Sequence, residues 1–382
     1  MSQQNHPSTH PPLPPTTEDE RVSWLRLLRS RRVGPATFYR LMAEHGSADT
    51  ALRALPDVAR AAGVDDYTPC SEAAARAEIK AARPHNARMI CIGEADYPAA
   101  LAEIPDAPPI LWATGDVSIL HRPMIALVGA RNASSLGTRM ARALARELAE
   151  NGYVVVSGLA RGIDAAAHSA VLDSGTIAVM AGGVDVLYPA ENAKLAQDIP
   201  RTGLRLSEHP FGMPPQARHF PQRNRIISGL AQALVVVEAA ARSGSLITAR
   251  NALDQGREVL AVPGHPFDAR AAGCNMLIRD GARLVRNAAD ILEALPQPDA
   301  PTLSQPELDL RALPNPPEKR SLRETADLHS QILGRLGPSP VAEDQLIRDL
   351  GSPARTVAPA LMDLELDGRI IRQPGGLLSL VT

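Results

Sequence analysis

Two hydrophobic patterns alternate along the middle of the chain. Short apolar runs, rich in valine and isoleucine and bounded by glycine or serine, occupy residues 125–128, 153–156, 177–180, 234–237 and 259–262. Stretches with helical spacing lie between them, the longest at about residues 135–150. Continuous apolar runs of this kind are typical of parallel strands that are buried on both faces, with helices as the connections. The pattern predicts a Rossmann-like α/β domain, a doubly wound parallel sheet, over about residues 116–295.

The region before this domain has helical periodicity. Apolar stripes at residues 24–28 and 38–42 flank a tight joint, Arg32-Val33-Gly34-Pro35, in which the proline is typical of a helix start. We therefore expect a helical N-terminal domain over about residues 19–115. Its joint is similar to helix-hairpin-helix modules, which present hairpin amides to DNA phosphates, although an ordinary helical turn would give the same pattern.

The end of the chain is predicted to form a third, small domain over about residues 325–382. Apolar positions at 329–333 and 341–350 precede a helix that begins at Ser352 and Pro353, as N-cap and first helical residue. A hairpin over residues 370–378 follows. Three helices and a hairpin describe a winged helix. Because its last helix carries several acidic residues, contact with a protein or dimerisation is favoured over the reading of bases.

Two proline-rich stretches separate the domains from each other and from the N-terminus. Residues 1–18 are polar and hold five prolines, so we expect them to form a disordered tail. They lack the charged start and the apolar stretch of a signal peptide. Residues 296–324 are a predicted linker, because residues 296–317 hold seven prolines and no sustained apolar period.

Apolar runs and cysteines exclude several classes of protein. No apolar run approaches the roughly 20 residues needed to span a bilayer. The cysteines, Cys70, Cys91 and Cys274, are odd in number and far apart, which speaks against a disulfide framework or a Cys-based zinc site. We therefore expect a cytoplasmic protein with no membrane segment and no metal site.

Charge is distributed unevenly between the domains. The chain has 382 residues and a formal net charge of -2, which by itself gives no hint of a polyanionic partner. Residues 121–290, however, hold 19 Lys and Arg against 14 Asp and Glu, a net +5, so the flanks together carry -7. Only three of the forty basic residues are lysine. A GC-rich coding sequence would explain this bias, but the planar guanidinium group also suits phosphate binding.

Ligands of a doubly wound sheet lie beyond the carboxyl ends of its strands, so the residues that follow each strand are the candidate site. Gly129-Ala130-Arg131 follows the first strand and leads through Ser134 to a helix whose unpaired amides suit an anion. Arg131 stands where a dinucleotide fingerprint needs a second glycine, and no Gly-Lys-Ser/Thr of a P-loop follows. The second strand ends in Ser157, where an NAD site needs an acidic residue. NAD binding and ATP hydrolysis therefore lack required parts.

The second strand also leads into a glycine turn with a cation, formed by Gly158 and Arg161. Asp164 is placed to cap the helix that follows, and His168 to make an internal hydrogen bond. After the third strand comes Lys194, the only lysine of this domain.

A cluster of basic residues with an aromatic lies between the third run and the fourth. Arg218, Arg223 and Arg225 interleave with Phe220 and Asn224 within eight residues. Aromatic faces stack bases while arginines hold phosphates, which is how single strands are bound without sequence preference.

The fourth strand ends at Glu238, with which Arg223 or Arg225 could instead pair inside the fold. Ser243-Gly244-Ser245 follows at the start of the next helix. It is another amide-rich turn suited to an anion.

Six motifs in a fixed order give the chain a family resemblance. They are V-G-A-R at 128–131, S-G-L-A-R-G-I-D-x-A-A-H at 157–168, Tyr188-Pro189, F-P-x-R-N-R-I-I-S-G-L at 220–230, S-G-S-L-I-T-A-R at 243–250 and A-V-P-G at 261–264. In these motifs, from about Met124 to Val285, the chain resembles the DprA (Smf) family, the DNA-processing proteins of bacterial natural transformation. That family commonly has a helical N-terminal domain and a winged-helix-like C-terminal domain.

The resemblance implies a protein that binds single-stranded DNA and helps to load RecA onto it, with no cofactor. The expected DNA-binding residues are Gly129, Arg131, Ser134, Gly158, Arg161, Lys194, Arg218, Phe220, Arg223, Asn224, Arg225, Ser243, Gly244 and Ser245. Lys194 is the weakest match, because the basic stretch after Tyr-Pro is thinner here. The resemblance also implies a homodimer. We expect its interface near Leu253, Met276 and Leu284, for which a place in the core is the alternative.

An enzyme of the lysine-decarboxylase-like group, a Rossmann-fold nucleotide hydrolase, is the alternative function. Those enzymes need a catalytic arginine and glutamate beside a Gly-Gly-x-Gly-Thr loop. Here the corresponding turn is residues 243–248, and Glu238 precedes it without a clear partner. Motifs for a nucleophile or a metal are absent from the sequence, so we expect a protein that is not an enzyme. A scaffold for other proteins would not explain basic residues at several strand ends.

Overall fold

The structure is a computed structural model that describes residues 13–295, 322–337, 339–373 and 376–380. The chain divides into two compact units, Met1–Gln297 and Pro298–Thr382. Residues 1–12 of the expected tail and residues 296–321 of the expected linker lie outside the described residues. Within those residues, no helix has both the length and the apolar character needed to cross a membrane.

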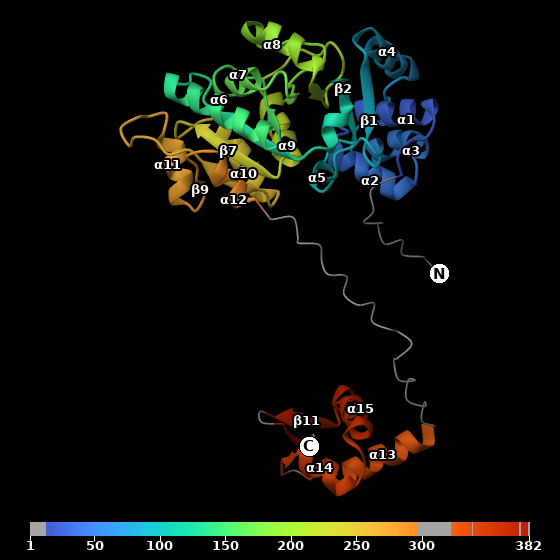
Figure 1. Ribbon diagram of the computed structural model, residues 1–382. Helices are drawn as coiled ribbons and strands as arrows, with labels where there is room; N and C mark the ends of the chain where they lie inside the picture. The colour runs from blue at the N-terminus through green and yellow to red at the C-terminus, as the bar shows by residue number, and fades with distance from the viewer. Residues whose placement is uncertain (1–12, 296–321, 338, 374–375, 381–382) are drawn as a thin grey trace. The chain divides into compact units, whose positions relative to one another are not determined.

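Four helices open the first unit, as the apolar stripes predict (Figure 1). They are α1 (Glu18–Arg29), α2 (Pro35–His45), α3 (Ala48–Ala61) and α4 (Glu72–Ala82). The first begins in a capping box, in which the Thr17 side chain accepts from the Glu20 amide at 3.2 Å. Both stripes are buried, with Trp24 and Phe38 in edge-to-face contact at 5.1 Å. The helical prediction for this part of the chain is confirmed.

Residues 87–115 depart from the expected all-helical region. They contain β1 (Ala87–Cys91), the short helix α5 (Ala99–Ala102) and β2 (Ile110–Gly115). The two strands pair antiparallel with each other, and β2 pairs antiparallel with β6 (Leu204–Ser207). Their apolar runs are short, but Leu111 and Trp112 are almost fully buried, so burial against the sheet decides their conformation.

The described residues of unit 1 form one nine-stranded sheet, in the order β1-β2-β6-β5-β4-β3-β7-β8-β9. Its other strands are β3 (Met124–Gly129), β4 (Val154–Ser157), β5 (Thr176–Val179), β7 (Ala233–Glu238), β8 (Glu258–Ala261) and β9 (Arg283–Leu284). All pairs from β6 to β9 are parallel. The five predicted runs agree with β3, β4, β5, β7 and β8 to within one residue at each end.

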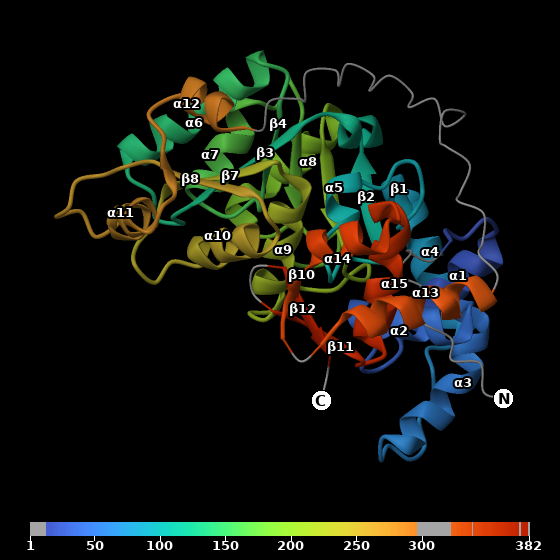
Figure 2. The same ribbon diagram turned by 90° about the horizontal axis from the view of Figure 1, so that it is seen from below.

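Helices cover both faces of this sheet (Figure 2). The helices after α5 are α6 (Ser135–Glu150), α7 (Ile163–Ala170), α8 (Ala193–Asp198), α9 (His219–Leu230), α10 (Ser245–Asp254), α11 (Ala272–Arg279) and α12 (Ala288–Ala294). Alternate residues of β3 enter different cores, Ile125 with α6, α7 and α12, and Ala126 with α9 and α10. The predicted doubly wound α/β architecture is confirmed.

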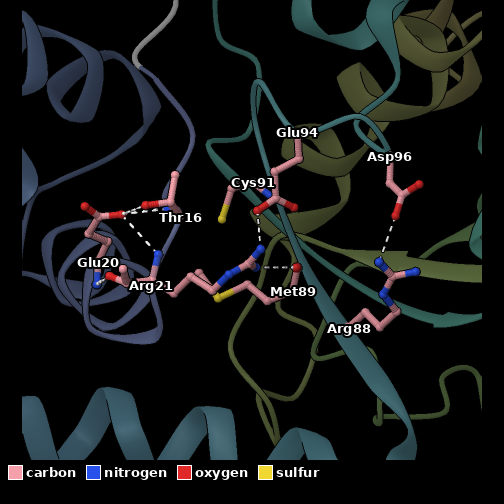
Figure 3. A network of polar contacts seen from close by, with 9 residues as sticks. Thr16, Glu20, Arg21, Arg88, Met89, Cys91, Glu94 and Asp96 are labelled. Carbon is pink, nitrogen blue, oxygen red and sulfur yellow. Dashed lines mark hydrogen bonds and ion pairs between the residues drawn. The ribbon is translucent and has the colours of Figure 1, made fainter.

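Polar contacts fasten the N-terminal helices to the edge of the sheet. In Figure 3, Arg21 of α1 donates to the Met89 carbonyl at 2.9 Å and forms an ion pair with Glu94. A second contact joins Arg29 to Glu78 at 2.8 Å, and the same carboxylate accepts from the Trp112 indole at 2.8 Å. The helices and the β1–β2 extension are therefore tied together at several points.

The second unit is a small winged helix, as predicted. Its elements are α13 (Leu322–Arg335), β10 (Val341–Ala342), α14 (Glu343–Leu350), α15 (Ala354–Leu366), β11 (Ile370–Gln373) and β12 (Leu377–Leu380). The strands form a sheet in the order β10-β12-β11. Its core includes Ile332, Leu361 and Leu378. The last helix starts one residue later than expected, with Pro353 as its N-cap.

Candidate functional site

The loops after the parallel strands meet at the carboxyl edge of the sheet and enclose two adjoining cavities. Pocket A, of about 530 Å³, is bordered by the turns after β3 and β7 and by one side of α9. Pocket B, of about 340 Å³, is bordered by the turns after β4 and β5. Both have Arg131, Ala160 and Phe220 in their walls. The site therefore lies where the topology of the sheet predicts it.

Arg131 and Phe220 separate the two pockets. The Arg131 guanidinium lies over the Phe220 ring, 5.1 Å from its centroid, in a cation–π contact. On the pocket B side, the Tyr188 ring lies 5.9 Å from Phe220 and is 48% exposed. Arg131 is exposed and makes no ion pair within the described residues, so its charge is available to a ligand.

The glycine turn after β3, residues 129–134, is closed by a carboxylate of the protein. Glu238, at the end of β7, accepts from the Ser134 amide at 2.8 Å, and the Ser134 hydroxyl accepts from the Gly137 amide at 2.9 Å. A Cβ on Gly137 would lie 2.6 Å from a Glu238 oxygen, so glycine allows this close approach. The start of α6 is thus already occupied by an anion of the protein.

The turn after β4, residues 158–162, is closed in the same way. Asp164 does not cap α7, whose N-cap is Gly162; its carboxylate instead accepts from the amides of Gly158 at 3.1 Å and Ala160 at 3.3 Å. Burial raises the pKa of Asp164, and the nearby Arg223 opposes that shift.

Arg223 completes this closed turn. Its side chain is buried, and one guanidinium nitrogen donates to the carbonyls of Gly158 and Val179, at the ends of neighbouring strands. A Cβ on Gly158 would lie 2.2 Å from that nitrogen, which explains the glycine by packing. Burial lowers the pKa of Arg223 to about 10. Arg223 lies in the wall of pocket A, but its donors are directed to the protein.

Behind the same turn, His168 makes the internal hydrogen bond that the sequence predicts. Its Nδ1 lies 2.8 Å from the Thr176 hydroxyl, which donates to the Val155 carbonyl at 2.6 Å. The ring is fully buried, and burial lowers the pKa of His168 to about 3. His168 is therefore neutral in the folded protein at physiological pH.

The turn after β7, residues 242–245, differs from the other two because it is open. Gly244 is the N-cap of α10 and offers no side chain to the helix amides. The hydroxyls of Ser243 and Ser245 bond to each other at 2.7 Å. Arg242 is exposed and, within the described residues, has no ion pair. The Ser243 amide donates to the Ala240 carbonyl at 3.0 Å, and the Ser245 amide donates to the Ser243 hydroxyl at 3.4 Å. The Gly244 amide, two hydroxyls and an unpaired guanidinium meet here in the wall of pocket A, and this combination suits a phosphate.

Arg225 lies on the other side of α9, outside both pockets. Its guanidinium forms ion pairs with Glu208 at 2.5 Å and with Asp106 at 3.2 Å. The alternative of an internal ion pair thus describes Arg225, although its partners are Glu208 and Asp106 rather than Glu238.

The remaining predicted residues are distributed more widely. Arg161 is in the wall of pocket B, 3.3 Å from Glu191. Lys194 is exposed, pairs with Asp198 at 3.5 Å and borders neither pocket. Arg218 is also outside both. The residues that pocket A does bring together are Gly129, Arg131, Phe220, Arg223, Asn224, Ser243, Gly244 and Ser245.

The three expected interface residues lie at one end of the sheet. Leu253 of α10 and Leu284 of β9 are 59% and 44% exposed, and Met276 of α11 is partly buried. The alternative of a core position is wrong for Leu253 and Leu284.

Sequence reasoning missed three residues that border the pockets. Tyr188 belongs to the Tyr-Pro motif, but its contact with Phe220 depends on the course of the loop after β5. Arg242 could have been found as the cation next to the Ser-Gly-Ser turn. Arg270 comes from the loop between β8 and α11, and no local signal predicts its position.

Comparison with known proteins connects this site to a family. The family described as DNA recombination-mediator protein A matches residues 88–296. A DprA-like N-terminal HHH domain matches residues 18–81, and a DprA winged helix domain matches residues 316–376. Three consecutive matches thus cover most of the chain.

Individual relatives agree with these matches. Protein Smf of Escherichia coli is 40% identical over 294 residues, covering 74% of this chain and 75% of that protein. DNA processing protein DprA of Bacillus subtilis is 45% identical over 222 residues, covering 57% of this chain and 75% of that protein.

Two solved structures share the fold. DNA processing protein A of Streptococcus pneumoniae has a TM-score of 0.57 and 34% identity, covering 72% of this chain and 94% of that one. DNA processing protein A of Helicobacter pylori, described for its single-stranded DNA binding mode, has a TM-score of 0.51 and 31% identity, covering 54% of this chain and 94% of that one. With the order of its domains, the turns at its strand ends and these relatives in agreement, the chain belongs to the DNA recombination-mediator protein A (DprA/Smf) family.

Proposed function

We propose that this chain binds single-stranded DNA without sequence preference in pockets A and B, and that it helps to load RecA onto that strand during natural transformation. The observation that carries the DNA-binding part is the open turn at residues 242–245, placed beside Arg131 and Phe220 in one cavity. The relative from Helicobacter pylori, whose described property is single-stranded DNA binding, supports the same assignment.

Each group in pocket A has a role in this proposal. A phosphate lies against the Gly244 amide and the hydroxyls of Ser243 and Ser245, between the guanidinium groups of Arg131 and Arg242. A base stacks on the exposed part of Phe220, with Tyr188 beside it, and Arg131 bridges the two subsites. Stacking and phosphate contacts are indifferent to base identity, which accounts for binding without sequence preference.

The closed turns speak against hydrolysis of a nucleotide. Glu238 would have to act as a catalytic carboxylate, but it accepts a hydrogen bond from the Ser134 amide and lies 3.9 Å from Arg270. We therefore propose a non-enzymatic, cytoplasmic protein. Steady turnover of AMP by the purified protein would contradict this.

Fluorescence anisotropy with a labelled oligo-dT over a series of salt concentrations tests the binding site. Affinity for single strands should exceed affinity for duplex and should fall steeply with salt, because phosphate neutralisation releases counterions. Arg131→Ala should reduce the slope of log affinity against log salt by about 0.7, the value of one phosphate contact on a single strand. Arg201→Ala is a matched control, since Arg201 is exposed, pairs with Asp198 at 3.2 Å and borders neither pocket. Equal affinity for duplex, or an unchanged slope in Arg131→Ala, would rule out this site.

The RecA partnership follows from the family resemblance. A pull-down of the host RecA with the full chain, with and without oligo-dT, is the direct test, and the absence of RecA from both samples would contradict it. The proposed homodimer is tested by sedimentation of the Leu253→Glu and Leu284→Glu variants, which should be monomeric if exposed leucines form the interface.

A further inference from the structure

The outer face of α6 carries a line of arginines. Arg139, Arg142 and Arg146 are all exposed, and their spacing of three and four residues places them on one side of the helix. The opposite side is buried, with Ala141, Leu144, Ala145 and Leu148 in the core. The three arginines therefore form a straight basic stripe, called here the α6 stripe.

The α6 stripe places three uncompensated charges on one side of one helix. In the described part of the chain, none of its three arginines forms an ion pair or a hydrogen bond. Other exposed arginines do pair with nearby carboxylates, as Arg53 does with Asp49 at 2.7 Å and Arg286 with Asp290 at 2.8 Å. Exposed arginines without an ion pair occur elsewhere among the described residues, as at Arg40 and Arg250, so the alignment of three of them on α6 is the feature that points to a ligand.

Two carboxylates of α6 lie close to the stripe in sequence. Glu147 faces α12 and accepts from the Ala288 amide at 3.0 Å. Glu150 is exposed in the last turn of the helix, one turn beyond Arg146. The first three turns of α6 therefore contain no acidic residue.

The stripe begins beside the proposed DNA site. The first turns of α6 and the loop of residues 263–271 enclose pocket C, of about 470 Å³, whose wall includes Arg139, Glu238 and Asp268. Arg270 joins pocket C to pocket A, because it borders pocket A and lies 3.1 Å from Asp268 and 3.9 Å from Glu238. The two acidic groups at this boundary are thus compensated by Arg270.

An exposed aromatic side chain belongs to the loop that borders pocket C. Phe267, in the loop between β8 and α11, is 94% exposed, and the His265 ring lies 5.5 Å from it. Leu136, in the first turn of α6, is 70% exposed. An exposed aromatic ring and uncompensated cations on the elements around one cavity are a combination that suits single-stranded nucleic acid.

We propose that the α6 stripe and Phe267 form a second contact for single-stranded DNA, which continues from pocket A past Arg270. This inference rests on the proposed function, since it extends the path of the same strand. Arg139 and Arg146 are seven residues apart, about 10 Å along the helix axis. At about 3.4 Å per nucleotide of a stacked strand, the stripe can contact up to about three phosphates.

Oligonucleotide length separates the stripe from the pockets. The α6 variant, Arg139→Gln with Arg142→Gln and Arg146→Gln, keeps good helix formers and should retain its circular dichroism spectrum. For an oligo-dT of about 30 nucleotides, the slope of log affinity against log salt should fall by up to about 2, three contacts at about 0.7 each. For one of about six nucleotides, close to the lower limit for a single site, the slope should not change.

A control variant tests whether lost charge alone has this effect. Arg53→Gln, Arg60→Gln and Arg201→Gln together remove three exposed arginines that pair with carboxylates far from α6 in the sequence. This variant should bind both oligonucleotides like the parent. Phe267→Ala should weaken binding of the long oligonucleotide between about fivefold and a hundredfold, the effect of one stacked base.

Three results would overturn the proposal. One is an unchanged slope for the long oligonucleotide in the α6 variant, and another is an equal loss for the short one. The third is intact DNA binding together with lost capture of RecA, which would make the stripe a protein-binding face. Failure of the proposed function looks different, because Arg131→Ala would then leave binding of the short oligonucleotide unchanged.

Discussion

The turns after β3 and β7 are both rich in glycine and serine, but a carboxylate of the protein binds only the first of them. Each joins a buried parallel strand to a helix through glycine and serine, at the same edge of the sheet. The start of α6 is occupied by the Glu238 carboxylate, whereas within the described residues no carboxylate binds the amides at the start of α10, whose N-cap is Gly244. A glycine-rich turn is therefore an anion site only where the fold supplies no carboxylate of its own.

This difference also separates two kinds of arginine. Arg223 belongs to a closed turn, where it donates to two buried carbonyls and compensates the Asp164 carboxylate, while Arg131 and Arg242 border the open one. The first kind should affect stability when it is removed, and the second kind should affect affinity.

The largest effect should come from the closed turn after β4. Arg223→Ala would leave the Gly158 and Val179 carbonyls without their donor and Asp164 without its compensating charge. Urea denaturation should show a loss of about 3–5 kcal/mol in the free energy of unfolding, as for other broken buried charge pairs. Arg201→Ala should change it by less than about 0.5 kcal/mol. A stable Arg223→Ala protein that has lost DNA binding would show instead that Arg223 contacts the ligand.

A carboxylate introduced at the β7 turn should close it in the way that Glu238 closes the β3 turn. Gly244→Asp places a carboxylate at the N-cap of α10, where a Cβ meets open space. We expect affinity for oligo-dT to fall roughly 10- to 100-fold, one charge-assisted contact, while stability rises by a few tenths of a kcal/mol. Gly244→Ala, which adds no charge, should bind nearly normally. Equal losses in both variants would mean that shape, rather than charge, governs this turn.

Folding stability and DNA affinity should also differ in their dependence on pH. The folded pKa of His168 is about 3, below its ordinary value of 6.5, so the unfolded state binds more protons between these values. Stability is therefore complete above about pH 6.5 and should fall by up to about 1.4 kcal/mol per unit below it. Burial lowers the pKa of His209 to about 4, which acts in the same direction.

Denaturation curves at pH 7 and pH 5 measure this loss, and His168→Asn should reduce it. Affinity for oligo-dT should stay flat between pH 6.5 and 8, since the open turn offers an amide, hydroxyls and arginines. A change of affinity over that range, where stability is expected to be constant, would contradict the division.

The smallest effect should come from weakening the closure of the β3 turn. Glu238→Gln keeps an oxygen for the Ser134 amide but removes the negative charge beside Arg270. We expect a loss of about 1 kcal/mol in unfolding free energy and an affinity for oligo-dT equal to that of the parent or a few times higher. A tenfold weaker affinity would instead assign Glu238 to the binding site.

Much of this fold could be predicted from the sequence, because five strands are continuous apolar runs. Other strands had no such signal. Residues 204–207 alternate Leu204, Arg205 and Leu206, with Arg205 buried, and β9 has only two residues. Strands β1 and β2 are short runs, and β6, the second partner of β2, is distant in the sequence.

The candidate site was predicted less completely, because tertiary contacts decide which arginines and which loop amides have no partner within the protein. Phe220, Asn224 and Ile227 recur at helical spacing and all border pocket A. Arg225 is five residues from Phe220, about 140° around α9, so helical geometry would have separated it from the pocket. Asp164 lies within six residues of the amides that it accepts from, so its place in the β4 turn is local in the sequence. That Glu238 occupies the β3 turn depends on a distance across strands, which no local pattern contains.

The antiparallel pairing of β2 with β6 has a practical consequence for dividing the chain. A fragment that begins at residue 116 would lose β1 and β2 and leave one side of β6 without hydrogen-bond partners. Exposed edge strands of this kind recruit other chains and promote aggregation. A fragment meant to isolate the α/β domain should therefore start before Ala87, so that the natural edge stays covered.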